Sequence, residues 1–477
     1  MMNMMNPPLI FIFISQCRYR SILLLLVLFI SILPGAMADY YAAQNGQTPA
    51  GTYTSWATAA SSIQDAVNAA TNGATVWVGA GRYTLPANAT NYMGSNVVYI
   101  NKLLTLNSSS GVPASTIIDG MGTNRGVTVY YAAGSATYRM VIDGFTFTNC
   151  VASNYGGALL LESANNVWTA MVQNCVFVNN KALCTSSNDY ALGGAIYNYN
   201  SWSAFGMTVS NCVFRSNMAT NSAYSVNSQG GAAHLRHYGK ELFANCLIES
   251  NYAGNNAGAI YQTYGKLEMD NCIVRGNRTF AYLNAGSGGG AIFLNGLITA
   301  RNCLLHHNVA YSGGWGGAVA CQRQGSGDTM LLQFYNCTIV SNYGGGGIYV
   351  RSWGPGQSYY PYLQVYNSII QSNTAYNIAA TAPPGYKNSY ISSCWYPTNG
   401  VSPEITEIGN ITSPVGFVDF AGQDFRLCSD SPAVNAGTNL DWMADLTDLD
   451  GHKRVRYGTV DAGAYEMIKD ATLYRFR

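Results

Sequence analysis

The chain is short of charge. Only 10% of its 477 residues are Asp, Glu, Lys or Arg, and the formal net charge is +1. A typical globular protein is about 25% charged, so solubility must come largely from amides, hydroxyls and glycine. A near-neutral chain has neither a basic field for nucleic acid nor an acidic field for a cationic partner. We therefore expect no nucleic-acid partner.

Long apolar runs are also scarce, and the main exception lies near the N-terminus. Residues 21–33 (SILLLLVLFISIL) follow two arginines and precede the small-residue stretch 36–38 (AMA). This order is typical of a secretory signal peptide. We predict a signal peptide over 1–38, cleaved after Ala38; the alternative is an uncleaved anchor. The run is short for a span of about 20 residues, so we expect a secreted or cell-surface protein with no membrane span in the mature chain.

In place of charge and apolar runs, the chain carries a repeat. Asn-Cys occurs seven times, and an eighth copy has Ser in place of Cys. From the second copy on, two mostly apolar residues, two variable residues and a second Asn follow. A Gly-Gly-Ala element alternates with these copies. The Asn-Cys copies lie at 149–150, 174–175, 211–212, 245–246, 271–272, 302–303 and 336–337, with Asn-Ser at 367–368. The second Asn residues are Asn180, Asn217, Asn251, Asn277, Asn308, Asn342 and Asn373. Gly-Gly-Ala lies at 156–158, 193–195, 230–232, 289–291 and 316–318, with variants at 257–259 and 345–347.

The segments between the motifs predict short strands. They alternate in polarity, are rich in β-branched and aromatic residues, and are bounded by Gly, Asn and Ser. The 3.6-residue periodicity of a helical solenoid is absent. Successive Asn-Cys copies lie 25, 37, 34, 26, 31 and 34 residues apart, which fits one coil of a parallel β-helix per copy. We therefore predict an all-β solenoid over 39–404, with the repeats at about 140–375 and coils stacked about 4.8 Å apart.

Stacked coils give the repeated Cys a structural interpretation. Cys packs as a small buried hydrophobe, so we expect a ladder of free thiols inside the coil and an amide ladder of the neighbouring Asn at a turn. Disulfides within the column, or a metal or catalytic role, are the alternatives. A metal site needs ligands that converge on one point, whereas a column spreads them along an axis. The other cysteines show no paired spacing; they are Cys17, Cys184, Cys321, Cys394 and Cys428.

The residues after each Gly-Gly-Ala predict an outward-facing stripe. The first is apolar, and strand alternation turns the second and fourth outward. Aromatic rings beside hydrogen-bonding groups suit sugars, so we expect a glycan-binding face; the alternative is ordinary sheet surface, where Tyr is also favoured. The second-position residues are Leu160, Tyr197, His234, Tyr261, Phe293, Ala320 and Tyr349, and the fourth are Glu162, Tyr199, Arg236, Thr263, Asn295, Gln322 and Arg351. The ligand-binding candidates are Tyr197, Tyr199, His234, Arg236, Tyr261, Phe293 and Tyr349.

The densest ionisable cluster is HLRHYGKE, residues 234–241. A polysaccharide lyase needs a base for the proton beside a uronic carboxylate and a cation that neutralises this carboxylate. His234 and Arg236 are therefore the catalytic candidates. The cluster also holds His237, Lys240 and Glu241, and adjacent coils add Glu268 and Asp270. A glycosidase needs two carboxylates, and the outward columns offer only Glu162. The alternative is that the cluster is simply the charged edge of a polar coil.

Loops of variable length between the second Asn and the next glycine pair are another candidate surface. They should leave from one corner of the coil and gather on one side, where function often lies; drift in loop length is the alternative. Each carries a tyrosine, namely Tyr190, Tyr224, Tyr252, Tyr282 and Tyr311.

Asp445, Asp448 and Asp450 resemble part of a calcium loop, and they are the only metal candidates. Calcium needs several oxygen ligands at fixed spacing and usually a terminal bidentate acid, and the pattern here is incomplete. An Asp-capped turn is the alternative. His306 and His307 point to opposite faces of a strand, so we do not expect them to share a metal. We expect no cofactor other than calcium.

Three stretches resemble known families. Residues 55–84 include a predicted capping helix, SSIQDAVNAAT, and resemble the opening of secreted right-handed parallel β-helix proteins of the pectin-lyase-like superfamily. The repeats are similar to those of polymorphic outer-membrane-protein adhesins, and 425–466 resembles the choice-of-anchor Q domain. The resemblance implies a right-handed β-helix with an N-terminal cap over 39–84 and a choice-of-anchor Q-like segment over 405–477. The acidic and Gly-His-Gly signatures of the superfamily's hydrolases are absent. Only eleven residues follow Glu466, so we expect no autotransporter barrel and no sorting anchor.

Three functions remain open at this point. The first is a non-catalytic protein that binds glycans or other surfaces, as an adhesin does. The second is a polysaccharide lyase or epimerase acting on uronate-containing chains. The third is a structural spacer. Fold does not choose among them.

Overall fold

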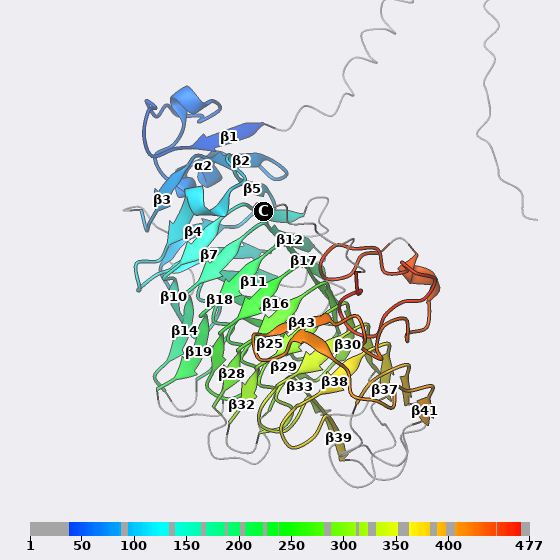
Figure 1. Ribbon diagram of the computed structural model, residues 1–477. Coiled ribbons are helices and arrows are strands. Elements are labelled where there is room, and N and C mark those ends of the chain that lie inside the picture. The colour runs from blue at the N-terminus through cyan, green and yellow to red at the C-terminus, as the bar shows by residue number, and fades with distance from the viewer. Residues whose placement is uncertain are drawn as a thin grey trace, which may run out of the picture. The chain divides into compact units, whose positions relative to one another are not determined.

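The computed structural model describes residues 38–86, 94–132, 139–163, 168–186, 189–200, 206–222, 227–236, 238–280, 288–311, 314–322, 331–351, 362–381, 389–396, 406–444 and 446–468. These residues form a right-handed parallel β-helix with a short N-terminal helix and a C-terminal segment (Figure 1). The predicted signal peptide, His237, Asp445, Tyr224 and Tyr282 lie outside the described residues. No described helix is long and apolar enough to cross a membrane.

Four long parallel sheets run along the stack. After the glycine pair, each coil begins in sheet IV and then passes through sheets I, II and III. Sheet I is β1 (Asp39–Ala42), β2 (Thr75–Val78), β5 (Thr105–Ser108), β8 (Met140–Asp143), β12 (Thr169–Gln173), β17 (Gly206–Ser210), β22 (Lys240–Ala244), β26 (Lys266–Asp270), β30 (Leu297–Arg301), β34 (Leu331–Tyr335), β37 (Tyr362–Tyr366), β40 (Tyr390–Ser392) and β41 (Thr406–Ile408). Sheet II is β3 (Gly81–Tyr83), β6 (Thr116–Asp119), β9 (Thr146–Thr148), β13 (Val176–Val178), β18 (Val213–Arg215), β23 (Leu247–Glu249), β27 (Ile273–Arg275), β31 (Leu304–His306), β35 (Thr338–Val340) and β38 (Ile369–Gln371).

Sheet III is β10 (Val151–Ser153), β14 (Lys181–Cys184), β19 (Met218–Asn221), β24 (Tyr252–Ala253), β28 (Arg278–Thr279) and β32 (Val309–Ala310). Sheet IV, whose strands begin each coil, is β4 (Asn96–Ile100), β7 (Arg125–Tyr131), β11 (Leu159–Ser163), β16 (Ile196–Asn200), β21 (Ala233–Arg236), β25 (Ile260–Gln262), β29 (Ile292–Leu294), β33 (Val319–Gln322), β36 (Ile348–Arg351) and β39 (Ile378–Thr381). Equivalent repeat positions pair directly, as in Ile196↔Ala233 and Val209↔Phe243. The register therefore follows the repeat.

Two tight bends in each coil explain the two asparagines of the repeat. Between sheets I and II, the Asn before each Cys has a positive φ, for example +53° at Asn211. Asn tolerates this left-handed conformation better than most residues. Between sheets II and III, the residue before the second Asn has a positive φ, as at Ser216 and Ser250. Each left-handed residue turns the chain sharply, so the residue after it points into the coil.

The expected amide ladder forms, but from the second Asn. The side-chain Nδ2 of Asn217 donates to Asn251 Oδ1 at 2.9 Å and to the carbonyl of Phe177 at 3.0 Å. The backbone N–H of Asn217 donates to the same Asn251 Oδ1 at 2.9 Å. The pattern repeats from Asn180 to Asn373. The predicted ladder at the Asn beside Cys forms only in part: Asn211 Nδ2 donates to Asn174 Oδ1 at 3.2 Å, whereas Asn302 and Asn336 donate to carbonyls of the C-terminal segment.

The ladder of thiols is present as predicted. Its cysteines are buried and free, and each Sγ donates to a carbonyl two residues earlier, as from Cys212 to Ser210 at 3.2 Å. Phenylalanines stack beside it, with Phe147, Phe177 and Phe214 4.8 Å apart. Cys394 joins the column although the sequence gives it no Asn, because Ser393 takes the positive φ there. The ladder is Cys150, Cys175, Cys212, Cys246, Cys272, Cys303, Cys337 and Cys394.

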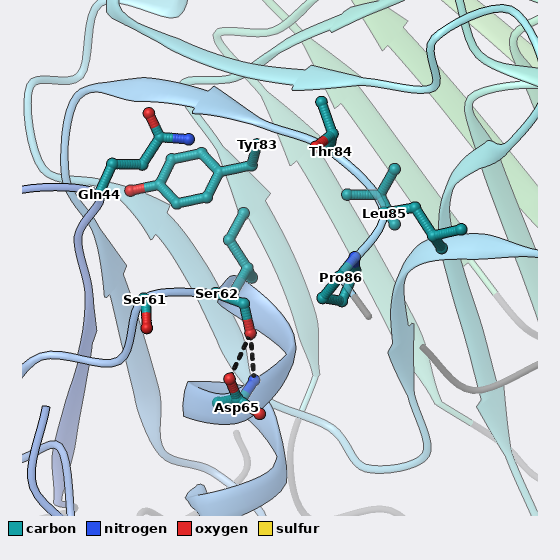
Figure 2. Close-up of a pocket in the computed structure, with 10 residues that line it drawn as sticks. Gln44, Ser61, Ser62, Asp65, Tyr83, Thr84, Leu85 and Pro86 are labelled. Atoms are coloured by element: carbon teal, nitrogen blue, oxygen red, sulfur yellow. Dashed lines mark hydrogen bonds between the residues drawn. The ribbon is translucent and has the colours of Figure 1, made fainter. Parts of the chain in front are cut away.

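The predicted N-terminal helix is α2 (Ile63–Ala69), which contacts β1, β2 and β4. Ser62 caps it, because its hydroxyl accepts from the backbone N–H of Asp65 at 3.1 Å and donates to the Asp65 carboxylate at 2.7 Å (Figure 2). The buried face of α2 includes Ile63 and Val67. A short 3-10 helix, η2 (Trp56–Thr58), precedes α2, and two others follow it at Pro113–Ser115 (η3) and Asp441–Met443 (η4).

The C-terminal segment packs against the stack. Its hairpin, β42 (Phe417–Asp419) and β43 (Asp424–Leu427), places Phe425 and Leu427 in a cluster with Leu304, Val340 and Ile369 of sheet II. Side-chain amides of three stacked turns donate to its carbonyls: Asn302 to Thr447, Asn336 to Asp461 and Asn367 to Thr438. Sheet I itself continues through β41, which the sequence analysis assigned to this segment.

Replacing one rung of the amide ladder should destabilise the fold. In Asn251→Ala, the backbone N–H of Asn217 loses its acceptor, the Asn217 amide loses one of its two acceptors, and the carbonyl of Phe214 loses a side-chain donor. We therefore expect a loss of about 3 kcal/mol in the free energy of unfolding. Denaturant titration followed by circular dichroism measures it. Asn245→Gly is the control, because it removes an exposed amide at a left-handed position; we expect a change within about 0.5 kcal/mol. Equal losses of unfolding free energy in the two variants would contradict the proposal that the buried ladder contributes more to stability than an exposed asparagine.

The thiols should be chemically silent in the native state. Burial raises the pKa of Cys150 and Cys394 to about 12, and only the thiolate reacts. In protein lacking residues 1–38, we expect only the partly exposed Cys428 to react quickly with a thiol reagent. Cys428→Ser should remove this fast phase, and denaturant should expose the remaining thiols. Several fast phases in the native protein would overturn this expectation.

Acid should weaken the fold partly through His306. Burial, with His307 and Arg275 nearby, lowers its pKa to about 3, against about 6.5 in an unfolded chain. The folded state therefore disfavours the proton, and the contribution of neutral His306 to stability is present above about pH 6.5 and lost as pH falls toward 3. We expect His306→Phe to flatten the dependence of melting temperature on pH over this window. Parallel curves for the two proteins would contradict this.

Candidate functional site

The predicted aromatic stripe exists, but most of it is buried. Tyr197, His234, Tyr261 and Phe293 are only 4, 2, 7 and 2% exposed. Their rings form a column on sheet IV, with centroids 5.4 Å apart from Tyr197 to His234, 4.8 Å from His234 to Tyr261 and 5.2 Å from Tyr261 to Phe293. The expectation that these four residues face solvent is wrong.

A second layer of chain explains this burial. The stripe points away from the coil interior, as strand alternation predicts, but the segment before each glycine pair folds back over sheet IV. Leu192 of β15 (Ala191–Leu192) packs with Leu160 and Tyr197 in one cluster, and Trp315 packs against Tyr261 and Phe293 in another. β15 pairs with β20 (Ser228–Gln229), so the cover has its own ladder. The stripe is therefore the core between two layers.

His234 cannot meet a substrate from this position. Burial, with the nearby positive charge of Arg236, lowers its pKa to about 3, so the imidazole is neutral at ordinary pH. Its Nε2 lies 3.2 Å from Thr263 Oγ1. His234 is therefore a poor catalytic base for an external polymer, contrary to its place among the candidates.

Part of the fourth column reaches the surface, although Gln322 is only 3% exposed. Arg236 is exposed, and its guanidinium lies 5.3 Å from the centre of the Tyr199 ring. Tyr199 is half-buried, as is Tyr349, whose ring stacks on Trp315 at 5.3 Å. Of the two catalytic candidates, only Arg236 remains accessible.

Beside Arg236, the turns from sheet IV to sheet I carry two exposed tyrosines. Tyr238 and Tyr264 are 61 and 39% exposed, and their rings stack at 4.7 Å with an angle of 11°. Gly296 lies next to Tyr264 in the following turn and has no side chain to cover it. Stacked rings at the surface offer a flat apolar platform. The sequence could have indicated them, because Tyr-Gly-Lys recurs at 238–240 and 264–266.

The lysines after these turns share one carboxylate. Lys240 and Lys266 are register partners on sheet I, and their ammonium groups lie 2.6 and 2.8 Å from the Glu268 carboxylate. Burial alone would raise the pKa of Glu268, but the hydrogen bonds and charges of the two lysines lower it below its ordinary value. We define the corner site as Arg236, Tyr238, Lys240, Tyr264, Lys266 and Glu268. The corner site holds three cationic side chains and one anionic side chain, and two of the cations pair with that anion.

Other members of the predicted ionisable cluster lie elsewhere. Glu241 points into the coil, where it accepts hydrogen bonds from Asn198 Nδ2 at 2.6 Å and from the backbone N–H of Met207 at 3.1 Å. Asp270 pairs with Arg301 at 3.1 Å. Strand alternation explains both positions, because Glu241 and Lys240 are neighbours on one strand and face opposite sides.

A hollow adjoins the corner site on the outer face of sheet I. It has a volume of about 340 Å³. Its walls combine apolar and cationic groups, so it extends the positive surface toward earlier coils. The lining side chains include Arg139, Thr169, Met171, Thr208, Lys240 and Leu242.

The structure does not favour the predicted calcium loop. Asp448 Oδ1 accepts from the backbone N–H groups of Asp450 at 3.0 Å and His452 at 2.7 Å. Its Oδ2 accepts from the backbone N–H of Glu466 at 2.8 Å. Asp450 pairs with Arg426 at 2.6 Å. These carboxylates are already engaged, as an Asp-capped turn requires. Among the described residues, no cluster of three His, Cys, Asp or Glu side chains is placed to hold a metal.

A second hollow lies beside α2, as Figure 2 shows, with a volume of about 380 Å³. Its lining includes Gln44, Tyr83 and Pro86 (Figure 2). Its one carboxylate, Asp65, is bonded to the helix cap. It brings together no pair of groups suited to acid–base chemistry.

Among the loop tyrosines, Tyr190 and Tyr311 are exposed and Tyr252 is half-buried. The segments predicted to be loops in fact begin as the strands of sheet III, so that Tyr252 lies within β24. Their described residues carry no ionisable cluster comparable to the corner site.

Comparison with known proteins adds a distant structural likeness. No protein-family model and no curated protein matches the chain. A solved structure titled "Crystal structure of pectate lyase Pel9A" aligns with 90% of this chain and 96% of its own, at 15% sequence identity and a TM-score of 0.47. The parallel register of the strands in this chain carries the fold assignment.

Proposed function

We propose that this protein is a secreted or cell-surface β-helix that binds acidic glycans at the corner site without turning them over. The observation that carries the proposal is the pairing of an exposed tyrosine platform with two lysines that share a single carboxylate. Arg236 adds a third cation beside the platform. The residual positive charge suits a uronate or sulfate group, and the rings suit the apolar face of the sugar.

A polysaccharide lyase is the second candidate. The observation in its favour is the exposed guanidinium of Arg236, which could neutralise a uronate carboxylate. The described corner nevertheless offers no accessible neutral base. His234 is buried, and both lysines are ion-paired. A binding role therefore needs fewer assumptions.

Neutralising the two lysines should weaken the binding of acidic glycans. In Lys240→Gln/Lys266→Gln, the side chains keep most of their length, but the site loses the charge that attracts carboxylates. We expect at least a tenfold rise in Kd for polygalacturonate or alginate, about 1.4 kcal/mol, together with weaker salt dependence. Isothermal titration calorimetry measures both.

The matched control is Lys181→Gln/Arg278→Gln, which removes two cations from sheet III and should leave Kd unchanged. Equal binding by the wild type and the corner variant would refute the site. The same polymers should be followed by ultraviolet absorbance for unsaturated products. Product formation by the wild type, abolished in Arg236→Ala, would replace the binding proposal with the lyase.

A further inference from the structure

Past the corner site, the outer face of sheet I changes from charged to uncharged. Gln333 and Tyr335 of β34 are register partners of Gln364 and Tyr366 of β37. All four side chains are half-buried. The tyrosine rings stack at 5.2 Å, with an angle of 4° between them. This part of the face therefore presents amides and phenols in matched rows.

Hydrogen bonds hold these rows in place. Thr299 Oγ1 donates to Gln333 Oε1 at 3.0 Å, and Gln333 Nε2 donates to Gln364 Oε1 and to the Tyr335 hydroxyl, each at 2.9 Å. The chain of bonds ends at Gln364, whose Nε2 donates to no described residue. An ordered donor at the end of such a chain is ready for an external acceptor, because its orientation is already fixed.

The C-terminal segment adds a wall to this face. Trp442 of η4 meets the Tyr335 ring edge-on at 5.7 Å, and the guanidinium of Arg301 lies 5.8 Å from the Trp442 ring. The segment is fixed nearby, because Thr438 and Asn367 exchange hydrogen bonds of 2.8 and 2.9 Å. We define the amide site as Gln333, Tyr335, Gln364, Tyr366 and Trp442.

The geometry points to a second binding site here, one for an uncharged glycan. Sugar hydroxyls both donate and accept, and they match a row of amides and phenols, while Trp442 offers apolar surface for ring C–H groups. An acidic ligand is not expected, because the cation beside this site, Arg301, is already paired with Asp270. The inference stands on residues outside the corner site and does not depend on acidic glycans binding there.

The test compares two variants and two ligand classes. Cello-, xylo- and manno-oligosaccharides are titrated calorimetrically into the intact protein and into Gln333→Ala/Gln364→Ala. We expect one of these neutral series to bind the intact protein and to lose about tenfold in affinity in the variant, because two side chains that position or make hydrogen bonds are removed. Acidic polysaccharide binding should be unchanged in this variant. The corner variant Lys240→Gln/Lys266→Gln should show the opposite pattern.

Two further variants keep the test independent of folding. Tyr335→Phe/Tyr366→Phe retains the stacked rings and removes only the hydroxyls, so it should melt like the wild type and bind the neutral ligand more weakly. Trp442→Ala should weaken the same ligand while leaving acidic polysaccharide binding intact. The inference is overturned if no neutral oligosaccharide binds the intact protein, or if Gln333→Ala/Gln364→Ala binds it with unchanged affinity. It is also overturned if the corner variant loses both ligand classes together, since the two sites would then be one.

Discussion

The buried amide ladder is the interaction on which the rest of the structure depends. Each coil bends sharply before its second Asn, and a bend of this kind leaves backbone groups that need partners inside an apolar core. Asn supplies both a donor and an acceptor in one short side chain, so one residue per coil satisfies the bend and links it to the next coil, as between Asn217 and Asn251. From Asn180 to Asn373 this link ties each coil to the next in the register that the strands share.

The repeat predicted the interior of the stack well, because interior positions obey local rules. Strand alternation and the Asn-Cys period were enough to place Cys212 in a ladder and to pair equivalent strands. The continuous buried ladder at the second Asn was not predicted, since sequence alone does not tell which of two asparagines occupies a left-handed bend and which points inward. Cys394 was missed for a related reason, because Ser393 takes the conformation that Asn takes elsewhere.

The outer surface was harder to predict, because it depends on what covers it. Alternation correctly turned Tyr197 and Tyr261 away from the coil interior, but it carries no information about a second layer of chain. Hydrophobicity is a better guide to burial than strand alternation here, because a column of Tyr, His and Phe can form a core as readily as a binding face. The exposed rings instead lie in the turns, at Tyr238 and Tyr264, where no sheet period applies.

The regular stacking of the coils fixes the distances between positions along the solenoid. Strands of sheet I succeed one another about 4.8 Å apart, and the lysine of β26 stands two strands before the glutamine of β34. The separation between the charged and uncharged parts of this face is therefore counted in whole coils, at about 10 Å for two steps. Gain or loss of a complete coil between them would leave every ladder intact and change only this count. The distance between the two proposed sites would then change in whole-coil steps, while each site kept its own residues.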